Sequence, residues 1–230
     1  MQLMFDDCSA LTALDLSSFD TSKVTYMYSM FKGCSGLREL DLHNFQTGKV
    51  VDMTSMFQNC SNLKSLDLRS FNTSLVSGMG SMFLNCCSLT TLDLSSFQTG
   101  KVTRMTSLFQ HCSSLTELDL SSFQTGNAYS FSSMFQGCSS LRSLDLSNFD
   151  TGNISSMEYM FDGCSNLAQL NISSFQTSNV YDMSYMFRGC RKLDNLNLSL
   201  WDTTKVLNYT DFMDKGKTIN GRPWEKLFEQ

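Results

Sequence analysis

Residues 11–36 read LTALDLSSFDTSKVTYMYSMFKGCSG, and the same pattern returns every 26 residues along the chain without insertion or deletion. Its clearest marker is a Met-Phe pair, or a close substitute, with a Cys four residues after the first member. That first member stands at Met4, Met30, Met56, Met82, Leu108, Met134, Met160 and Met186. A strict period of this length predicts a solenoid, in which each repeat forms one rung packed on its neighbours. The period indicates the architecture, whereas the ligand depends on other, surface residues.

The first half of each repeat has the pattern of a short strand. Leu14 and Leu16 alternate with Asp15, so the leucines are expected to point inward and the Asp outward. Because equivalent segments are one period apart, we expect them to lie side by side as a parallel sheet.

The second half of each repeat places its apolar residues at helical spacing. Val24, Met27, Met30, Phe31 and Cys34 stand at offsets of three, six, seven and ten, which is one face of a helix of about three turns. Leucine strands with a helical return resemble leucine-rich repeats. The sequence therefore predicts an α/β solenoid, a right-handed array with short parallel strands on one face and short helices on the other, 26 residues per rung.

Two further columns join the halves of the repeat. An aromatic residue, Phe19 in the first full repeat, is expected to fill the turn between strand and helix, and Trp201 takes its place in the last rung. Two residues after it stands a Thr in all eight rungs, at Thr21, Thr47, Thr73, Thr99, Thr125, Thr151, Thr177 and Thr203. We expect its hydroxyl to bond backbone groups in the bend or to cap the helix that follows.

The residue pattern of the repeat resembles that of one known family. The phrase V-x-x-M-x-S-M-F-x-x-C, with the F-x-T before it, is similar to the 26-residue repeat of bacterial surface proteins and lipoproteins, a mycoplasma-type repeat related to BspA-like leucine-rich repeats. The last rung, from Trp201 to Met213, resembles that family's W-D-x-S-x-V-x-x-M-x-x-M-F. The resemblance covers residues 1 to 213 and implies surface exposure and adhesion to a host or neighbouring cell.

Composition limits the classes of function. Charged residues make up 17% of the chain and its net charge is -5, with no continuous basic patch, so we expect no nucleic-acid partner. No apolar run approaches the roughly 20 residues that span a bilayer, so we expect no membrane span in this chain. The resemblance implies a cell-surface or secreted protein, although the sequence shows no signal or anchor.

We divide the chain into two parts. Tandem repeats occupy 1–204 and begin in mid-repeat, which is what a fragment of a longer protein would show. A degenerate last repeat and a C-terminal cap occupy 205–230, where Trp224, Leu227 and Phe228 are expected to cover the apolar end of the array.

The cysteines and histidines give no sign of an enzyme. Eight of nine cysteines share one repeat phase and only Cys87 is extra, so we expect a column of buried free thiols, with disulfides between rungs as the alternative. His111 beside Cys112 suggests a cysteine nucleophile, but Cys112 is one of that column. No catalytic or phosphate-binding motif occurs, and we predict a protein without enzymatic activity.

An outward column of acidic residues on the strand face is the candidate site. Three interpretations remain open: a framework ladder accepting hydrogen bonds, a polar binding face, and a ladder of Ca²⁺ sites. No other cofactor is expected. The candidate residues on this face, expected to be concave, are Asp15, Asp41, Asp67, Asp93, Asp119, Asp145, Glu39, His43, Arg69 and Glu117.

The leading hypothesis is a non-enzymatic adhesion module that engages a protein or glycan through the polar strand face. The main alternative is a structural spacer that projects another domain and binds nothing itself. Ice binding through the Thr column is a minor alternative. Clustered departures from the repeat favour binding, and the departures include Tyr26, Tyr28, Tyr159, Tyr181 and Tyr185.

Overall fold

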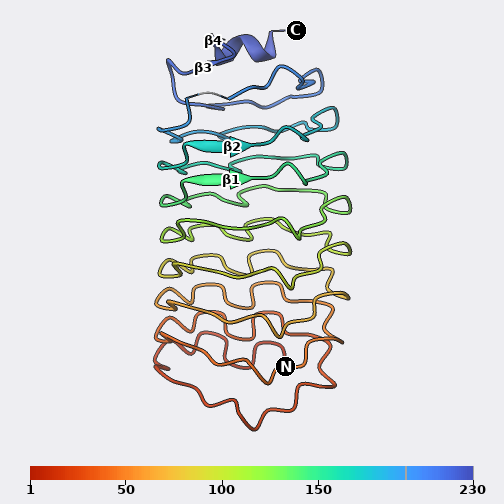
Figure 1. Ribbon diagram of the computed structural model, residues 1–230, viewed down its shortest axis with the longest axis vertical. Helices are drawn as coiled ribbons and strands as arrows, with labels where there is room; N and C mark the ends of the chain where they lie inside the picture. Colours follow the sequence, from red (N-terminus) through yellow and green to blue (C-terminus); the bar gives the residue numbers. More distant parts are fainter. Residues whose placement is uncertain (195, 230) are drawn as a thin grey trace.

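The chain forms a single stack of rungs in the computed structural model, which describes residues 1–194 and 196–229 (Figure 1). The backbone winds about one long axis, with the two termini at opposite ends of the stack. Strand β1 (Ser143–Asp145) pairs in parallel with β2 (Gln169–Asn171), and Leu144 lies opposite Leu170 one period later. The predicted repeat solenoid is therefore confirmed.

The leucine segments form the strand face, defined here as residues 11–18 and their equivalents in later rungs. Among the described residues, β1 and β2 are the only strands paired on this face. In other rungs of this face, backbone hydrogen bonds to the neighbouring rung are fewer. Examples run from the Lys64 amide to the Arg38 carbonyl at 3.1 Å and from the Thr90 amide to the Lys64 carbonyl at 3.5 Å. A parallel strand pair is thus confirmed in two rungs only.

The predicted helix in the second half of each rung is wrong, because no α-helix occurs in the part of the chain that the structure describes. Ser29 has a φ of +52° and Gly33 a φ of +73°, and positive φ recurs at both positions in each later rung through Tyr185 and Gly189. An α-helix needs negative φ throughout, so these residues end it before it forms. The segment runs instead as consecutive turns, with Met30 N–H to Met27 O at 3.2 Å and Cys34 N–H to Phe31 O at 3.2 Å.

These turns form the turn face, defined here as residues 25–34 and their equivalents. Alternate amides of a rung donate to carbonyls of the next rung, for instance Ser29 to Thr54 at 2.9 Å and Phe31 to Met56 at 2.9 Å. A helix would use these amides within itself. The turn face therefore holds neighbouring rungs together through their backbones.

The core between the two faces is built from columns of identical residues. One Phe per rung stacks on the next with ring centroids 5.4 to 5.8 Å apart and nearly parallel rings, through Phe5, Phe31, Phe57, Phe83, Phe109, Phe135, Phe161 and Phe187. From Phe31 onward these rings are fully buried. Each ring loses its water-exposed area only when the next rung is in place, which explains the strict period.

The Thr column also ties rung to rung. Thr99 donates its hydroxyl to the Gln124 carbonyl at 2.9 Å and accepts the Gln124 amide at 2.7 Å, and Thr47 bonds Asn72 in the same way. Helix capping by this column is wrong, since no α-helix occurs in residues 1–194 and 196–229. The ice-binding hypothesis is also wrong for this column, because its hydroxyls are buried and cannot order surface water.

A short C-terminal unit lies against the last rung. Strands β3 (Thr218–Ile219) and β4 (Arg222–Pro223) form an antiparallel hairpin, followed by the 3-10 helix η1 (Trp224–Phe228) (Figure 1). Trp224 is buried, and the Thr203 hydroxyl bonds the Leu227 carbonyl at 3.0 Å, where earlier rungs offer a carbonyl of the next repeat. The division at residue 205 stays a prediction.

Candidate functional site on the strand face

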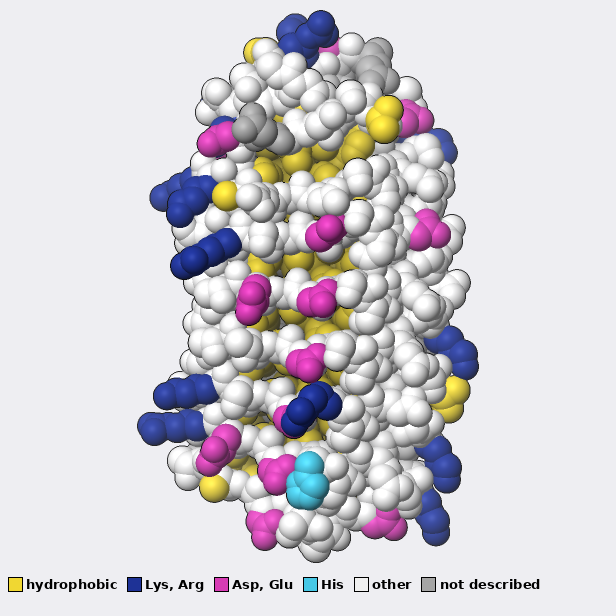
Figure 2. Space-filling view, viewed as in Figure 1, with side chains coloured by type: hydrophobic (Ala, Val, Ile, Leu, Met, Phe, Trp, Pro, Cys, Tyr) yellow, Lys and Arg dark blue, Asp and Glu magenta, His cyan; other side chains and the backbone are white. Residues whose placement is uncertain are grey.

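The predicted acidic column lies exposed along the strand face. Figure 2 shows acidic side chains following the axis of the stack above a hydrophobic floor. The floor includes Leu66, Leu92 and Leu118, which keep 6 to 9% of their surface exposed. The leucine two residues after each of them is almost completely buried. The period-two alternation of the leucine segment thus separates polar and apolar side chains as predicted.

Each residue of the acidic column closes a small turn with its own backbone. Asp15 accepts the Ser17 amide at 2.9 Å, and Asp93 accepts both the amide and the hydroxyl of Ser95, at 3.0 and 2.7 Å. Hydrogen bonding by Ser17 lowers the pKa of Asp15 from its ordinary value, because the bonds favour the ionised carboxylate. The same turn recurs in all eight rungs, at Asp15, Asp41, Asp67, Asp93, Asp119, Asp145, Asn171 and Asn197.

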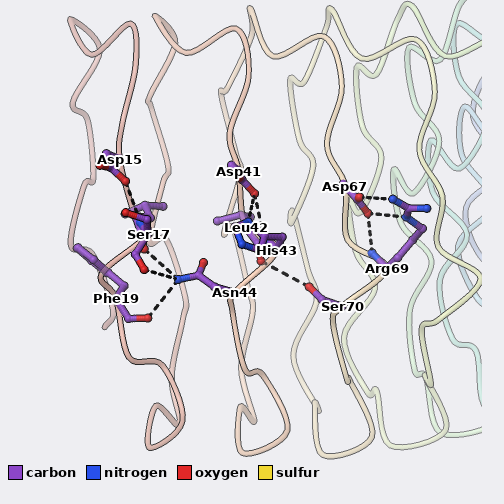
Figure 3. A network of polar contacts seen from close by, with 11 residues as sticks. Asp15, Ser17, Phe19, Asp41, Leu42, His43, Asn44, Asp67, Arg69 and Ser70 are labelled. Atoms are coloured by element: carbon purple, nitrogen blue, oxygen red, sulfur yellow. Dashed lines mark hydrogen bonds and ion pairs between the residues drawn. The ribbon is translucent and has the colours of Figure 1, made fainter.

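Two departures from the repeat place an Arg and a His side chain against this column (Figure 3). Arg69 binds Asp67 through two nitrogens, at 2.9 and 2.6 Å, and His43 Nδ1 lies 2.7 Å from Asp41 Oδ1. The Arg69 side chain is the main cause that lowers the pKa of Asp67, to about 2. Both pairs are solvent-exposed, so they orient side chains more than they stabilise the fold.

The strand face is hollowed where several candidates meet. Asp67, Arg69, Asp93, Glu117 and Asp119 line one depression of about 530 Å³ whose apolar wall comes from the leucine floor. Glu39 and His43 do not line it. A second depression of about 710 Å³ lies over β1 and β2. The structure therefore gathers five of the ten candidates around one hollow.

A polar column that the sequence analysis missed lies beside the acidic one. Asn44 donates to the Leu16 carbonyl at 3.1 Å, and Ser96 donates to the Leu68 carbonyl at 3.3 Å, each reaching the preceding rung. Figure 3 shows two members of this column next to the acidic side chains. Its signal in the sequence was that only Ser or Asn occupies the position in the first seven rungs, before Leu200 takes it in the eighth; these residues are Ser18, Asn44, Ser70, Ser96, Ser122, Asn148 and Ser174.

From Cys34 onward the cysteine column is a column of buried free thiols, as predicted, while Cys8 in the first rung is half-buried. All nine cysteines are free, and Cys60 donates to the Phe31 carbonyl at 3.1 Å, a contact that recurs rung after rung. Burial raises the pKa of Cys60 to about 12 and that of Cys112 well above its ordinary value. Thiols of this kind are not nucleophiles at neutral pH, which removes the reason for pairing Cys112 with His111.

The described residues contain no group of three or more His, Cys, Asp or Glu side chains placed to hold a metal ion. Nor does any helix in residues 1–194 and 196–229 have the length and apolarity needed to cross a bilayer.

The stacked rungs and leucine-lined face define the class of the molecule, a leucine-rich-repeat-like solenoid. One solved structure supports that class, the crystal structure of the T. pallidum leucine-rich repeat protein TpLRR. It is 21% identical, has a TM-score of 0.51, and the match covers 77% of this chain and 75% of that protein. At this identity the likeness concerns the fold alone.

The sequence also matches a protein family along nearly its whole length. The family described as "Mycoplasma protein of unknown function, DUF285" matches residues 1–118, 65–145 and 107–225. The chain belongs to this family, which confirms the mycoplasma-type resemblance of its repeat. A search of curated proteins finds no match.

Proposed function

We propose that the chain is a non-enzymatic interaction module that binds a protein or glycan through its strand face, and that it acts in adhesion at a cell surface. The observation that carries the proposal is the hollow formed by Asp67, Arg69, Asp93, Glu117 and Asp119 above the leucine floor. A surface that combines fixed polar groups with accessible apolar area suits recognition of a partner.

The turns of the acidic column pre-organise this surface. The Asp93 bonds to Ser95 use Oδ1, which leaves Oδ2 without a partner among the described residues. A carboxylate held in this way loses little conformational freedom when a partner donates a hydrogen bond to it. The framework role and the binding role of the column are therefore compatible.

A structural spacer is the second candidate function. The Phe stack runs from Phe5 to Phe187 without a break, and the Thr ties accompany it, which is what a rigid projecting rod requires. A spacer makes no use of the hollow on the strand face, so a binding experiment separates the two candidates.

The test is a binding screen of the purified chain against extracellular-matrix proteins and glycans at physiological salt. A ligand that binds wild type should bind the Asp93→Asn, Asp119→Asn double variant at least about tenfold more weakly, because Asn keeps the turn but loses the charge. Asp202→Asn is the matched control, since Asp202 closes the same kind of turn outside the strand face. Wild type that binds nothing would favour the spacer, and equal binding by the double variant would reject the strand face.

We propose further that the interaction needs no cofactor. Titration of Ca²⁺ against the melting temperature tests the calcium alternative, and a rise in melting temperature at millimolar Ca²⁺ that the double variant loses would support a calcium ladder.

A further inference from the structure

The exposed aromatic residues of the turn face lie mostly in the C-terminal half of the stack, with Tyr26 as the exception at the N-terminal end. Tyr129 and Tyr181 are 48 and 50% exposed, and Leu207 in the same column is 84% exposed. In the N-terminal half that column carries smaller side chains. From the first full rung onward it reads Thr25, Val51, Ser77, Thr103, Tyr129, Ser155, Tyr181 and Leu207. In this column the large side chains therefore lie in the C-terminal half of the stack.

A second pair of tyrosines on this face occupies a strained backbone position. Tyr159 and Tyr185 have φ values of +56° and +59°, in a column where the preceding five rungs have Ser. A bulky residue in this region costs free energy that a framework role does not require. Their rings stack 4.5 Å apart, and the Arg188 guanidinium lies 4.5 Å from the Tyr185 ring while binding Asp162 through two nitrogens at 2.8 Å.

The two groups of tyrosines lie on neighbouring segments of the turn face. The Tyr181 amide bonds the Ser155 carbonyl at 3.0 Å, and the Tyr159 amide bonds the Ser184 carbonyl at 2.9 Å, so these segments lie side by side in adjacent rungs. Asp182 pairs with Ser156 in the same ladder.

The surface carries negative charge that the chain does not neutralise. Arg188 already forms an ion pair with Asp162. Glu158 and Asp182 have no ion-pair partner among the described residues. Burial raises the pKa of Glu158, and the like charge of Asp182 raises it further.

We propose that this tyrosine patch, consisting of Tyr129, Tyr159, Tyr181, Tyr185, Glu158 and Asp182, is a second docking surface that takes an arginine- or lysine-rich segment of a partner protein. Charge complementarity favours a cationic partner, because such a segment brings the counter-charge that the patch lacks. Cationic side chains also gain from lying on aromatic rings. Tyr and Arg contacts carry a large share of binding energy at protein interfaces. The patch is separate from the strand face and does not depend on the function proposed for it.

The test uses the full chain and a fluorescein-labelled peptide of alternating arginine and glycine, compared with the same peptide carrying glutamine in place of arginine. Wild type should prefer the arginine peptide. The Tyr129→Thr, Tyr181→Ser double variant should bind it at least about tenfold more weakly. These substitutions install residues that the same column already carries at Thr103 and Ser155, so the fold should be kept, as thermal melting will verify.

Two further variants decide which surface binds the peptide. Glu158→Gln with Asp182→Asn should weaken binding and flatten its dependence on salt, because the ionic part of the interaction is removed. Asp93→Asn with Asp119→Asn, on the strand face, should leave peptide binding unchanged. The proposal is overturned if wild type does not prefer the arginine peptide, if the tyrosine double variant binds like wild type, or if only the strand-face variant loses binding.

Discussion

The strand face and the turn face are made by the same 26-residue repeat, yet they are held to neighbouring rungs in different ways. On the turn face, alternate amides from Met27 to Gly33 donate to the next rung at 2.7 to 3.0 Å, and this recurs through the stack. On the strand face, paired strands are described only at β1 and β2, and Ser and Asn side chains supply other links. The turn face therefore stabilises the array, while the strand face can vary at little cost to the fold.

The largest expected effect comes from the core beneath the turn face. Phe83→Ala removes one fully buried ring from the middle of the aromatic stack and should lower the free energy of unfolding by about 3 to 5 kcal/mol. Chemical denaturation measures the change. Asp93→Ala on the strand face is the matched comparison and should leave the midpoint almost unchanged. Equal losses for the two variants would contradict the asymmetry between the faces.

A smaller loss is expected when one rung-to-rung tie is removed. Thr99→Val keeps the shape of the side chain but leaves the amide and carbonyl of Gln124 without the hydroxyl, which should cost about 1 to 3 kcal/mol. Thr99→Ser retains the hydroxyl and serves as the control. A Val variant as stable as the Ser variant would show that the Thr column does not tie the rungs.

The positive φ of the turn face can be tested within one rung. Ser81→Val places a β-branched residue at a φ of +57° and should cost about 1 to 2 kcal/mol, because its Cβ crowds the backbone there. Ser77→Val lies four residues earlier at a position where another rung already has Val51, and should be nearly neutral. Similar losses of stability for both substitutions would argue against a strained, positive-φ backbone at Ser81.

The smallest effect should come from the strand face itself as pH changes. Hydrogen bonds lower the pKa of Asp67 and Asp93 from the ordinary 3.8, and that of Asp67 to about 2. A lowered folded-state pKa gives stability that is present above the unfolded value and lost as pH falls through the folded one. The melting temperature should therefore fall between about pH 4 and pH 2. Asp67→Asn, Asp93→Asn should make that fall shallower, and an unchanged slope would contradict this role for the turns.

Much of the fold could be predicted from the sequence because burial follows the repeat directly. The inward leucines, the Phe and Cys columns and the outward Asp column were each visible as one residue type in one phase, and all lie where the period placed them. The family resemblance followed from the same framework positions.

The helix could not be excluded from spacing alone. Consecutive turns bury residues three or four apart, as a helix does, so Met27, Met30 and Cys34 fit both structures. The recurring Ser at position 29 and its equivalents was the available clue, but Ser is not a strong signal for positive φ. The period already predicts which rungs are neighbours, but the hollow around Glu117 and the tyrosine patch also depend on how the turns direct side chains within each rung, and only the structure shows that.

The central claim is that each repeat is a helix-free rung whose turns bond to the next rung, and far-ultraviolet circular dichroism of the purified chain tests it most directly. The turn structure predicts a spectrum without the double minimum of an α-helix, because the described residues include only the short 3-10 helix η1. One helix of about three turns per rung would place roughly a third of the chain in α-helix and give that double minimum strongly. A strong helical spectrum from the folded chain would contradict the account.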